Sequence, residues 1–275
     1  MIVADFRIIS YNHHESDMKR FSLLLLLASI ATASINAQDT DSINSPDLPV
    51  ENAKFPEEHP GGWNFDVLFS PKRESKYWYP REAFNFSFGF IGGVNQAEGV
   101  HLNMGQSFEI ELGNILRAQT PVGRNGVFVI GLGIGWRNYR MTNRQMFAKH
   151  EDGSISVEPY PEGADPKFSR IKTFGFILPL KYYHKVGHGR RTFFAVGPEL
   201  YYMPHASLKT RYRTEEGKQT LKDNKLHFNK FSVGIGAEFC VQGLGVYYKY
   251  NPFNLLDTDY GPKFSTMTVG LKVTL

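Results

Sequence analysis

The chain has 275 residues, of which 41% are hydrophobic and 21% charged, with 26 glycines, 22 phenylalanines, 14 tyrosines and one cysteine. The mean hydropathy of −0.33 and the lack of any run of ~18 apolar residues argue against a helical membrane protein. A single cysteine excludes an internal disulfide. Because no Cys/His ligand spacing accompanies it, we expect no metal site and no cofactor.

The stretch 18–37 carries the three parts of a secretion signal. Two basic residues follow Met18, a largely apolar run over 21–30 is too short to span a bilayer, and small residues lead up to a cleavage point after Ala37. A signal of this kind normally begins within a few residues of the initiating methionine. We therefore predict a signal peptide at 18–37 and a non-native or misassigned extension at 1–17.

Residues 38–83 differ in composition from the rest of the chain. Their first half is polar, acidic and contains prolines, as in a disordered linker. The second half carries aromatic residues, among them Trp63, Phe65 and Trp78, which indicates that part of it packs on something. We predict a mostly irregular periplasmic linker.

From Phe84 onward, the chain alternates bulky apolar residues with small or polar ones, which is the strand pattern. In the first such segment, phenylalanines alternate with Asn85, Ser87 and Gly89. No segment with helical periodicity interrupts the series. The eight alternating segments lie at about 84–90, 107–113, 128–137, 173–182, 194–202, 231–240, 244–251 and 266–275.

The connections between these segments alternate in length. Those after the first, third, fifth and seventh segments are long, at 95–105, 142–168, 204–225 and 252–263, and those between are short, at 117–125, 184–190 and 241–243. An even strand number with long loops on one rim and short turns on the other is typical of transmembrane β-barrels. We predict an all-β fold, with an eight-stranded antiparallel outer-membrane barrel at 84–275 and a periplasmic linker and C-terminus.

Alternation alone does not say which face points outward. A soluble eight-stranded barrel or a sandwich also alternates, with its apolar face inside. The apolar face of this chain, however, carries more bulk than an eight-stranded interior holds. The opposite face is rich in glycine, serine and threonine. We therefore predict that the apolar face meets lipid and that the small, polar face lines the lumen.

With that orientation, four acids and four bases point into the lumen. Charges cut off from water persist when they are paired, so this set predicts a structural, salt-bridged plug. An ion path or a catalytic site would need an open lumen, which eight strands do not normally leave. The eight residues are Glu109, Glu111, Arg137, Lys181, Glu199, Glu238, Lys249 and Lys272.

His205 and Ser207 are the candidate catalytic residues, with Glu215 and Glu216 nearby in the sequence. A His-x-Ser pair at a barrel rim is similar to the lipid A deacylase family, whose barrels use His, Ser and Glu; an oriented histidine can deprotonate a serine next to lipid. That family has asparagine after the serine, whereas Leu208 follows here. We expect no enzyme, and a lipid A-modifying esterase stays open as an alternative.

Glycine-rich stretches at 89–95 and 131–133 and the closing Val-Gly-Leu-Lys-Val at 269–273 resemble the PorT-like outer-membrane β-barrel proteins of Bacteroidetes. The resemblance covers roughly 84–275. It implies an outer-membrane location, and some relatives are linked to protein secretion. It brings no catalytic residues. One departure is the terminal Leu275, where barrels recognised by the insertion machinery often end in an aromatic residue.

We expect a monomeric structural or interaction protein, secretion-associated if the resemblance extends to function, that acts through its exposed loops. Its partners would be outer-membrane lipid and lipopolysaccharide, the barrel-insertion machinery during biogenesis, and an unknown protein at loops 142–168 and 204–225. A small channel is a further alternative.

The formal net charge of +4 is unevenly distributed. Residues 38–83 hold nine acids and five bases, whereas the region from Phe84 onward has a net charge of +8. Its bases gather in the short connections and in the connection after the fifth segment. These are membrane rims, where Lys and Arg can meet lipid phosphates. No nucleic-acid partner is needed to explain the charge.

Overall fold

The computed structural model describes residues 62–67, 78–80, 84–142, 144–187 and 191–274. The predicted extension, signal peptide and most of the predicted linker lie outside these residues. In the described part of the chain, no helix is long and apolar enough to cross a membrane.

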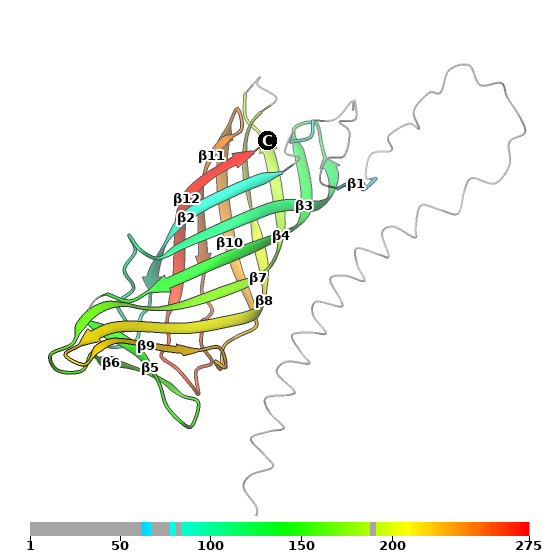
Figure 1. Ribbon diagram of the computed structural model, residues 1–275. Coiled ribbons are helices and arrows are strands. Elements are labelled where there is room, and N and C mark those ends of the chain that lie inside the picture. The colour runs from blue at the N-terminus through cyan, green and yellow to red at the C-terminus, as the bar shows by residue number, and fades with distance from the viewer. Residues whose placement is uncertain (1–61, 68–77, 81–83, 143, 188–190, 275) are drawn as a thin grey trace, which may run out of the picture. The chain divides into compact units, whose positions relative to one another are not determined.

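Eight strands close into an antiparallel barrel, each pairing with its neighbours in the order β3-β2-β12-β11-β10-β8-β7-β4 (Figure 1). The pairing of β3 with β4 completes the circle. The predicted all-β, eight-stranded barrel is thereby confirmed. The barrel strands are β2 (Asn85–Val94), β3 (Phe108–Val122), β4 (Gly126–Arg140), β7 (Asp165–Lys185), β8 (Thr192–Thr214), β10 (Phe231–Val241), β11 (Leu244–Asn251) and β12 (Ser265–Thr274).

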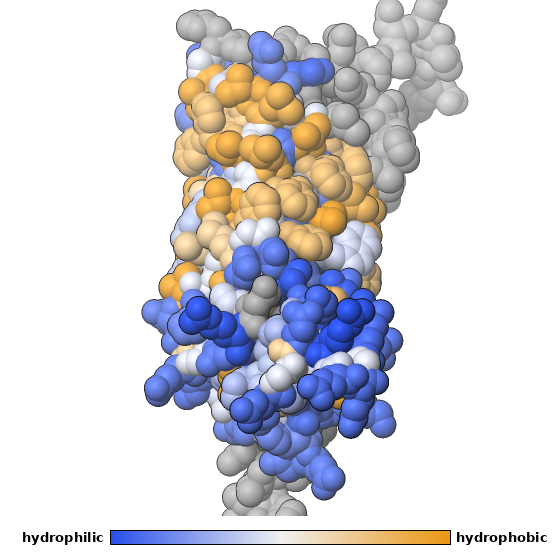
Figure 2. All heavy atoms as spheres, turned by 60° about the vertical axis from the view of Figure 1, so that its left-hand side comes forward, coloured by the Kyte–Doolittle hydropathy of each residue, from blue (hydrophilic) through white to orange (hydrophobic). Residues whose placement is uncertain are grey.

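The outer face of the barrel carries an apolar belt. Leu244, Leu271 and Ile235 are 67%, 65% and 57% exposed, whereas the carboxylate-bearing Glu109 on the inner face is 0% exposed. Figure 2 shows this belt as a continuous band with a hydrophilic zone next to it. Soluble proteins rarely expose an apolar patch of more than a few hundred Å². The belt therefore meets lipid, and the barrel is of the transmembrane type, with the predicted side-chain orientation.

Glycines on the inner face leave space for large lumen side chains. Gly89 and Gly270 pair across β2 and β12. The ring of Tyr247 occupies the space where a Cβ on either glycine would lie, and a Cβ on Gly270 would also meet the carbonyl oxygen of Phe88. Because the lumen of an eight-stranded barrel is barely wide enough for its own side chains, small residues at these positions allow tyrosines and long charged residues to fit.

The structure differs from the sequence-based expectation at the long-loop rim, the end of the barrel where the long connections lie. Strands β7 and β8 have 21 and 23 residues, about twice the 9–11 that cross a bilayer. The regions 142–168 and 204–225, expected as loops, are largely strand: β5 (Gln145–Lys149) pairs with β6 (Ile155–Pro159), and β9 (Gly217–Asp223) pairs with β8.

The reason for this difference lies in the outward-facing residues. Beyond the belt, the outward positions of β7 hold Lys172 and Arg170 in place of apolar residues, so the sequence no longer alternates apolar with polar. Its inward residues Thr173, Ile171 and Ser169 stay buried, and the strand continues. On the opposite, short-turn rim, residues 117–122 of the expected 117–125 connection also belong to a strand, β3.

Part of the expected irregular linker is ordered on the barrel wall. Strand β1 (Asn64–Val67) pairs antiparallel with residues 116–119 of β3. The barrel strand β2 begins only at Asn85, opposite Gly113, and leaves this part of the β3 edge unpaired. A bulge at this point includes Asn114, which has a φ of 57°. Since an open edge offers unpaired backbone groups, β1 continues the sheet where β2 stops.

Candidate functional site in the barrel lumen

The structure brings the eight predicted lumen residues together in one connected set of ion pairs, here called the charge network. They come from seven of the eight barrel strands, because every second residue of each strand points inward. All eight are buried, with at most 8% of each residue exposed. They are Glu109 and Glu111 on β3, Arg137 on β4, Lys181 on β7, Glu199 on β8, Glu238 on β10, Lys249 on β11 and Lys272 on β12.

Lys249 is the centre of one half of the charge network. Its Nζ lies 3.5 Å from Oε1 of Glu109 and 3.2 Å from Oε2 of Glu199, and it also donates to Glu111. Arg137 contacts the same pair of β3 carboxylates, with Nε 3.0 Å from Oε2 of Glu109 and Nη2 3.7 Å from Oε1 of Glu111. Two bases thus share three acids in this half.

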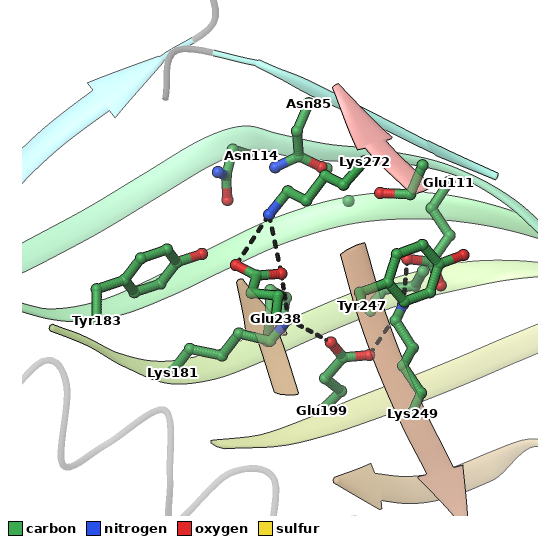
Figure 3. A pocket seen from close by; sticks show the side chains of 15 residues that line it. Asn85, Glu111, Asn114, Lys181, Tyr183, Glu199, Glu238, Tyr247, Lys249 and Lys272 are labelled. Carbon is green, nitrogen blue, oxygen red and sulfur yellow. Dashed lines mark hydrogen bonds and ion pairs between the residues drawn. The ribbon is translucent and has the colours of Figure 1, made fainter. Parts of the chain in front are cut away.

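Lys181 connects this half to the other. Its Nζ lies 2.7 Å from Oε1 of Glu199 and 3.1 Å from Oε2 of Glu238. Lys272 donates to both oxygens of Glu238 at 3.0 Å. Figure 3 shows acids and bases alternating from Lys272 through Glu238, Lys181 and Glu199 to Lys249. Four acids and four bases balance in formal charge, and this balance offsets the high cost of removing each ion from water.

Two tyrosines complete the charge network, and the sequence-based site did not include them. Tyr201 donates to Glu199, and Tyr247 donates to Oε1 of Glu109 at 3.0 Å. The guanidinium of Arg137 lies 4.0 Å from the ring centroid of Tyr201, a cation–π contact. Both tyrosines occupy inward positions of their strands, two residues from a network member, so the alternation that identified the charges also contained the signal for them.

The charge network leaves little free space. A cavity of about 30 Å³ lies beside it, lined in part by Asn85, Asn114 and Tyr183. Such a volume holds a few water molecules at most. Within the part of the chain that the structure describes, no group of three or more His, Cys, Asp or Glu side chains is arranged to hold a metal ion. The geometry fits a packed polar interior.

Apolar side chains fill the lumen at the long-loop rim. They come from the barrel strands, the β5–β6 hairpin and the connections at this rim, and they form one cluster of buried residues, here called the long-rim cluster. Its members are Ile91, Val100, Tyr139, Met141, Phe147, Ile155, Ile171, Met203, Ala206, Leu208, Leu226, Leu255, Leu256 and Phe264. The charge network is therefore separated from the long-loop side by a packed apolar layer.

A second, smaller apolar cluster lies toward the short-turn rim, with Trp78 and Tyr79 packed against it. The ring centroids of Trp78 and Phe193 are 6.3 Å apart, and Nη1 of Arg117 donates to the carbonyl oxygen of Pro80 at 3.4 Å. This part of the expected linker thus contributes to the lumen contents. The cluster, here called the short-rim cluster, comprises Val127, Val129, Tyr183, Phe193, Ala195 and Cys240.

His205 and Ser207 lie elsewhere, on the outward face of β8. His205 is exposed and Ser207 half-buried, and they pair with Phe174 and Lys172 of β7. In the described part of the chain, no hydrogen bond joins them. Glu215 and its neighbour Glu216 are exposed just after β8 ends. Glu215 is eight residues beyond Ser207, about 26 Å along an extended strand, so the structure does not assemble the three residue types.

No protein-family model matches the chain, and no curated protein matches it in sequence. Among solved structures, a triple mutant of the porin from Rhodopseudomonas blastica is similar over 70% of this chain and 98% of the porin chain. The sequence identity is 11% and the TM-score is 0.17. A score this low means that the two chains do not superpose as wholes. The barrel assignment therefore depends on the strand pairing and the exposed belt.

Proposed function

We propose that this protein is a small outer-membrane barrel with a closed lumen, acting as a structural or interaction protein through the part beyond its long-loop rim. In this proposal, the long-loop rim faces the outside of the cell, and the linker and C-terminus lie in the periplasm. The observation that carries it is the filling of the lumen by three successive layers: the long-rim cluster, the charge network and the short-rim cluster.

The balance of the charge network supports a structural role over a transport role. An ion path needs sites that an ion can enter and leave. Here Glu109, Glu199 and Glu238 already have lysine or arginine partners within 2.7–3.5 Å. The apolar layers at both rims would also have to open. We therefore favour a closed barrel over a channel.

The part beyond the long-loop rim supports an interaction role. The β5–β6 hairpin contributes Phe147 and Ile155 to the long-rim cluster. The backbone N–H of Phe147 donates to Oγ of Ser169 at 3.0 Å, and Nζ of Lys149 lies 2.8 Å from Oδ2 of Asp223 on β9. These contacts hold the outer strands as a defined surface, which suits a partner-binding part better than a set of loose loops.

We include membership of the PorT-like family in this proposal. The three resembling stretches lie on β2, β4 and β12, and two of them are partners in the barrel, since Phe90 pairs with Val269. A role in secretion, as in some members of that family, would then require contact with other secretion components.

Impermeant maleimide labelling on intact cells tests the orientation. The one native cysteine, Cys240, is buried, so an introduced cysteine reports its own position. The two variants are E216C and V186C. Glu216 lies just after β8 beyond the long-loop rim, Val186 lies just after β7 at the short-turn rim, and both side chains are exposed. We expect E216C to react in intact cells and V186C to react only after the outer membrane is permeabilised. The reverse pattern would overturn the proposed orientation.

Two further measurements test the location and the closed lumen. A barrel in the outer membrane should fractionate with that membrane and migrate differently on SDS gels before and after boiling. Recovery as a soluble periplasmic protein would contradict the proposal. In planar bilayers, we expect the purified protein to be silent, whereas steady single-channel conductance would establish the channel alternative.

A further inference from the structure

Four basic residues form a row across the outer face of the sheet beyond the apolar belt. Arg140 of β4 pairs with Arg170 of β7, Arg170 pairs with Lys209 of β8, and Lys209 pairs with Lys222 of β9. Paired residues of neighbouring strands point to the same face. Residues next to the row, such as Leu208, are buried on the inner face, so the row faces outward. We call these four residues the basic row.

Like charges directly opposite each other destabilise a sheet, and the basic row places bases opposite one another on three successive strand pairs. The pKa of Lys209 is lowered mainly by the nearby positive charge of Arg211. Within the described part of the chain, no residue of the basic row forms an ion pair. Two acids on the same strands are engaged elsewhere, Asp223 of β9 with Lys149 at 2.8 Å and Asp165 of β7 with Lys167 at 2.6 Å. The basic row therefore carries a positive potential that neighbouring side chains leave uncompensated.

A single aromatic ring organises the arginines. The guanidinium carbons of Arg170, Arg211 and Arg140 lie 4.6, 5.4 and 5.6 Å from the ring centroid of Phe168. Within the described part of the chain, Nε of each of these arginines is buried and has no hydrogen-bond partner. Of the three guanidinium groups, only that of Arg140 makes a hydrogen bond, from Nη2 to the carbonyl oxygen of Lys167 at 2.7 Å. Guanidinium groups that pack on a ring in this way are held in place. The buried Nε atoms are out of a ligand's reach, whereas the Nη groups of Arg170 and Arg211, which donate to no group in the described part of the chain, are left for an anion.

The basic row lies just beyond the aromatic boundary of the belt. Trp136 and Phe174 pair across β4 and β7, with ring centroids 5.3 Å apart. Arg140 and Arg170 also pair with each other, four residues further along the same strands. Four residues extend about 13 Å along a strand, or about 10 Å along the membrane normal at the usual tilt. Headgroups occupy the first 5–8 Å or so outside the hydrocarbon, within reach of long basic side chains.

We propose that the basic row binds the phosphate groups of an outer-leaflet glycolipid whose acyl chains lie against the adjoining apolar belt. Arginine forks bind phosphate in a bidentate manner. Four strands span three inter-strand spacings, about 14 Å, which exceeds one phosphate and favours a headgroup with at least two. On the outer face, a hydrophilic zone directly adjoins the apolar belt (Figure 2), and a basic row beside an apolar surface favours a lipid over a soluble polyanion. The inference rests on the proposed outer-membrane location and orientation.

A matched pair of double variants tests this inference. R170Q/K209Q removes one arginine and one lysine that pair in the basic row. R213Q/K218Q removes the same two residue types, also paired, toward the far end of the β8–β9 hairpin. The probe is bisphosphorylated lipid A, added to each purified protein in detergent and measured by native mass spectrometry. Dephosphorylated lipid A, inorganic phosphate and a short DNA duplex are the comparison ligands, and heat-modifiable migration checks the folding of each variant.

We expect R170Q/K209Q to bind bisphosphorylated lipid A about tenfold more weakly or worse, since two charge-assisted contacts are lost, and R213Q/K218Q to bind within about twofold of the native protein. Equal loss in both variants, unchanged binding by R170Q/K209Q, equal binding of dephosphorylated lipid A, or a preference for DNA would each overturn the inference. Maleimide labelling is independent of these assays, so a failure of the proposed orientation is recognised separately.

Discussion

The charge network in the lumen and the basic row on the outer face use the same residue types in opposite ways. In the charge network, bases and acids alternate, and the single ammonium group of Lys249 lies near three carboxylates. In the basic row, Arg170 pairs with Arg140 on one side and Lys209 on the other. A buried set has to balance its charge because water is absent. An unbalanced set persists only where solvent or a ligand supplies the counter-charge. The comparison therefore assigns the charge network a structural role and the basic row a binding role.

Breaking the balance of the charge network should produce the largest effect. We expect K249M to lower the free energy of unfolding by about 3–5 kcal/mol, because three buried carboxylates lose their shared cation. Urea titration of the detergent-solubilised barrel, followed by tryptophan fluorescence, measures this. The double variant K249M/E111Q should recover part of the loss by removing one of those negative charges. If K249M had the same urea midpoint as the native protein, the charge network would contribute little to stability.

Opening the short-turn side of the lumen should have an intermediate effect. Trp78 packs against Phe193 at the short-rim cluster, so we expect W78A to cost about 1–3 kcal/mol in the same titration. W78A should stay silent in planar bilayers, because the charge network and the long-rim cluster still fill the lumen. W63A is the control, since Trp63 contacts Phe128, an outward-facing residue. Conductance by W78A would show that the lumen is closed by the packing of Trp78 on the short-rim cluster and not by the other two layers.

Removing charge from the basic row should change the free energy of unfolding in the opposite direction, toward greater stability. We expect R170Q/K209Q to raise the free energy of unfolding in lipid-free detergent at low salt by about 0.2–1 kcal/mol, because repulsion between paired bases is relieved. The gain should shrink as salt is added. Stability would then rise while lipid A binding falls, which is the mark of residues kept for binding. A clear loss of stability would instead assign the row a structural role.

The smallest effect should come from the ion pair between Lys149 and Asp223, which joins the β5–β6 hairpin to β9. The pKa of Asp223 is lowered, mainly by the hydrogen bond from Lys149. A lowered pKa means that the stabilisation is complete above the unfolded value near 4 and is lost as pH falls through the folded value. Because the pair is partly exposed, its contribution is about 0–1 kcal/mol.

Hydrogen exchange of the hairpin, corrected for intrinsic rates, measures this contribution. Protection at residues 145–159 should be constant from pH 7 to about 5 and fall at lower pH. D223N should show reduced protection at neutral pH and a weaker response to acid. A loss of protection in the native protein between pH 7 and 6 would point to other groups.

The sequence led to most of the barrel because lipid imposes a strict pattern on it. Phe86, Phe88 and Phe90 alternate with small residues, and only a strand with two different surroundings has that period. The same alternation identified the eight lumen charges. The extensions of β7 and β8 were missed because Lys172 and Arg170 face water, so the outer half of the pattern disappears there while the inner half continues.

Other features could be found only in the structure because they depend on which strands become neighbours. The number of barrel strands, their direction, the lipid-facing side and the identity of the lumen charges follow from sequence periodicity, connection lengths and side-chain volume. Register across strands decides the partners within the charge network and the alignment of Arg140, Arg170, Lys209 and Lys222. The contact of Trp78 with Phe193 comes from the packing of a segment outside the barrel strands. Register joins residues as far apart in the sequence as Asn85 and Thr274, and no local pattern encodes it. Alternation determined the barrel, and tertiary pairing decided which of its charges are satisfied and which remain available to a ligand.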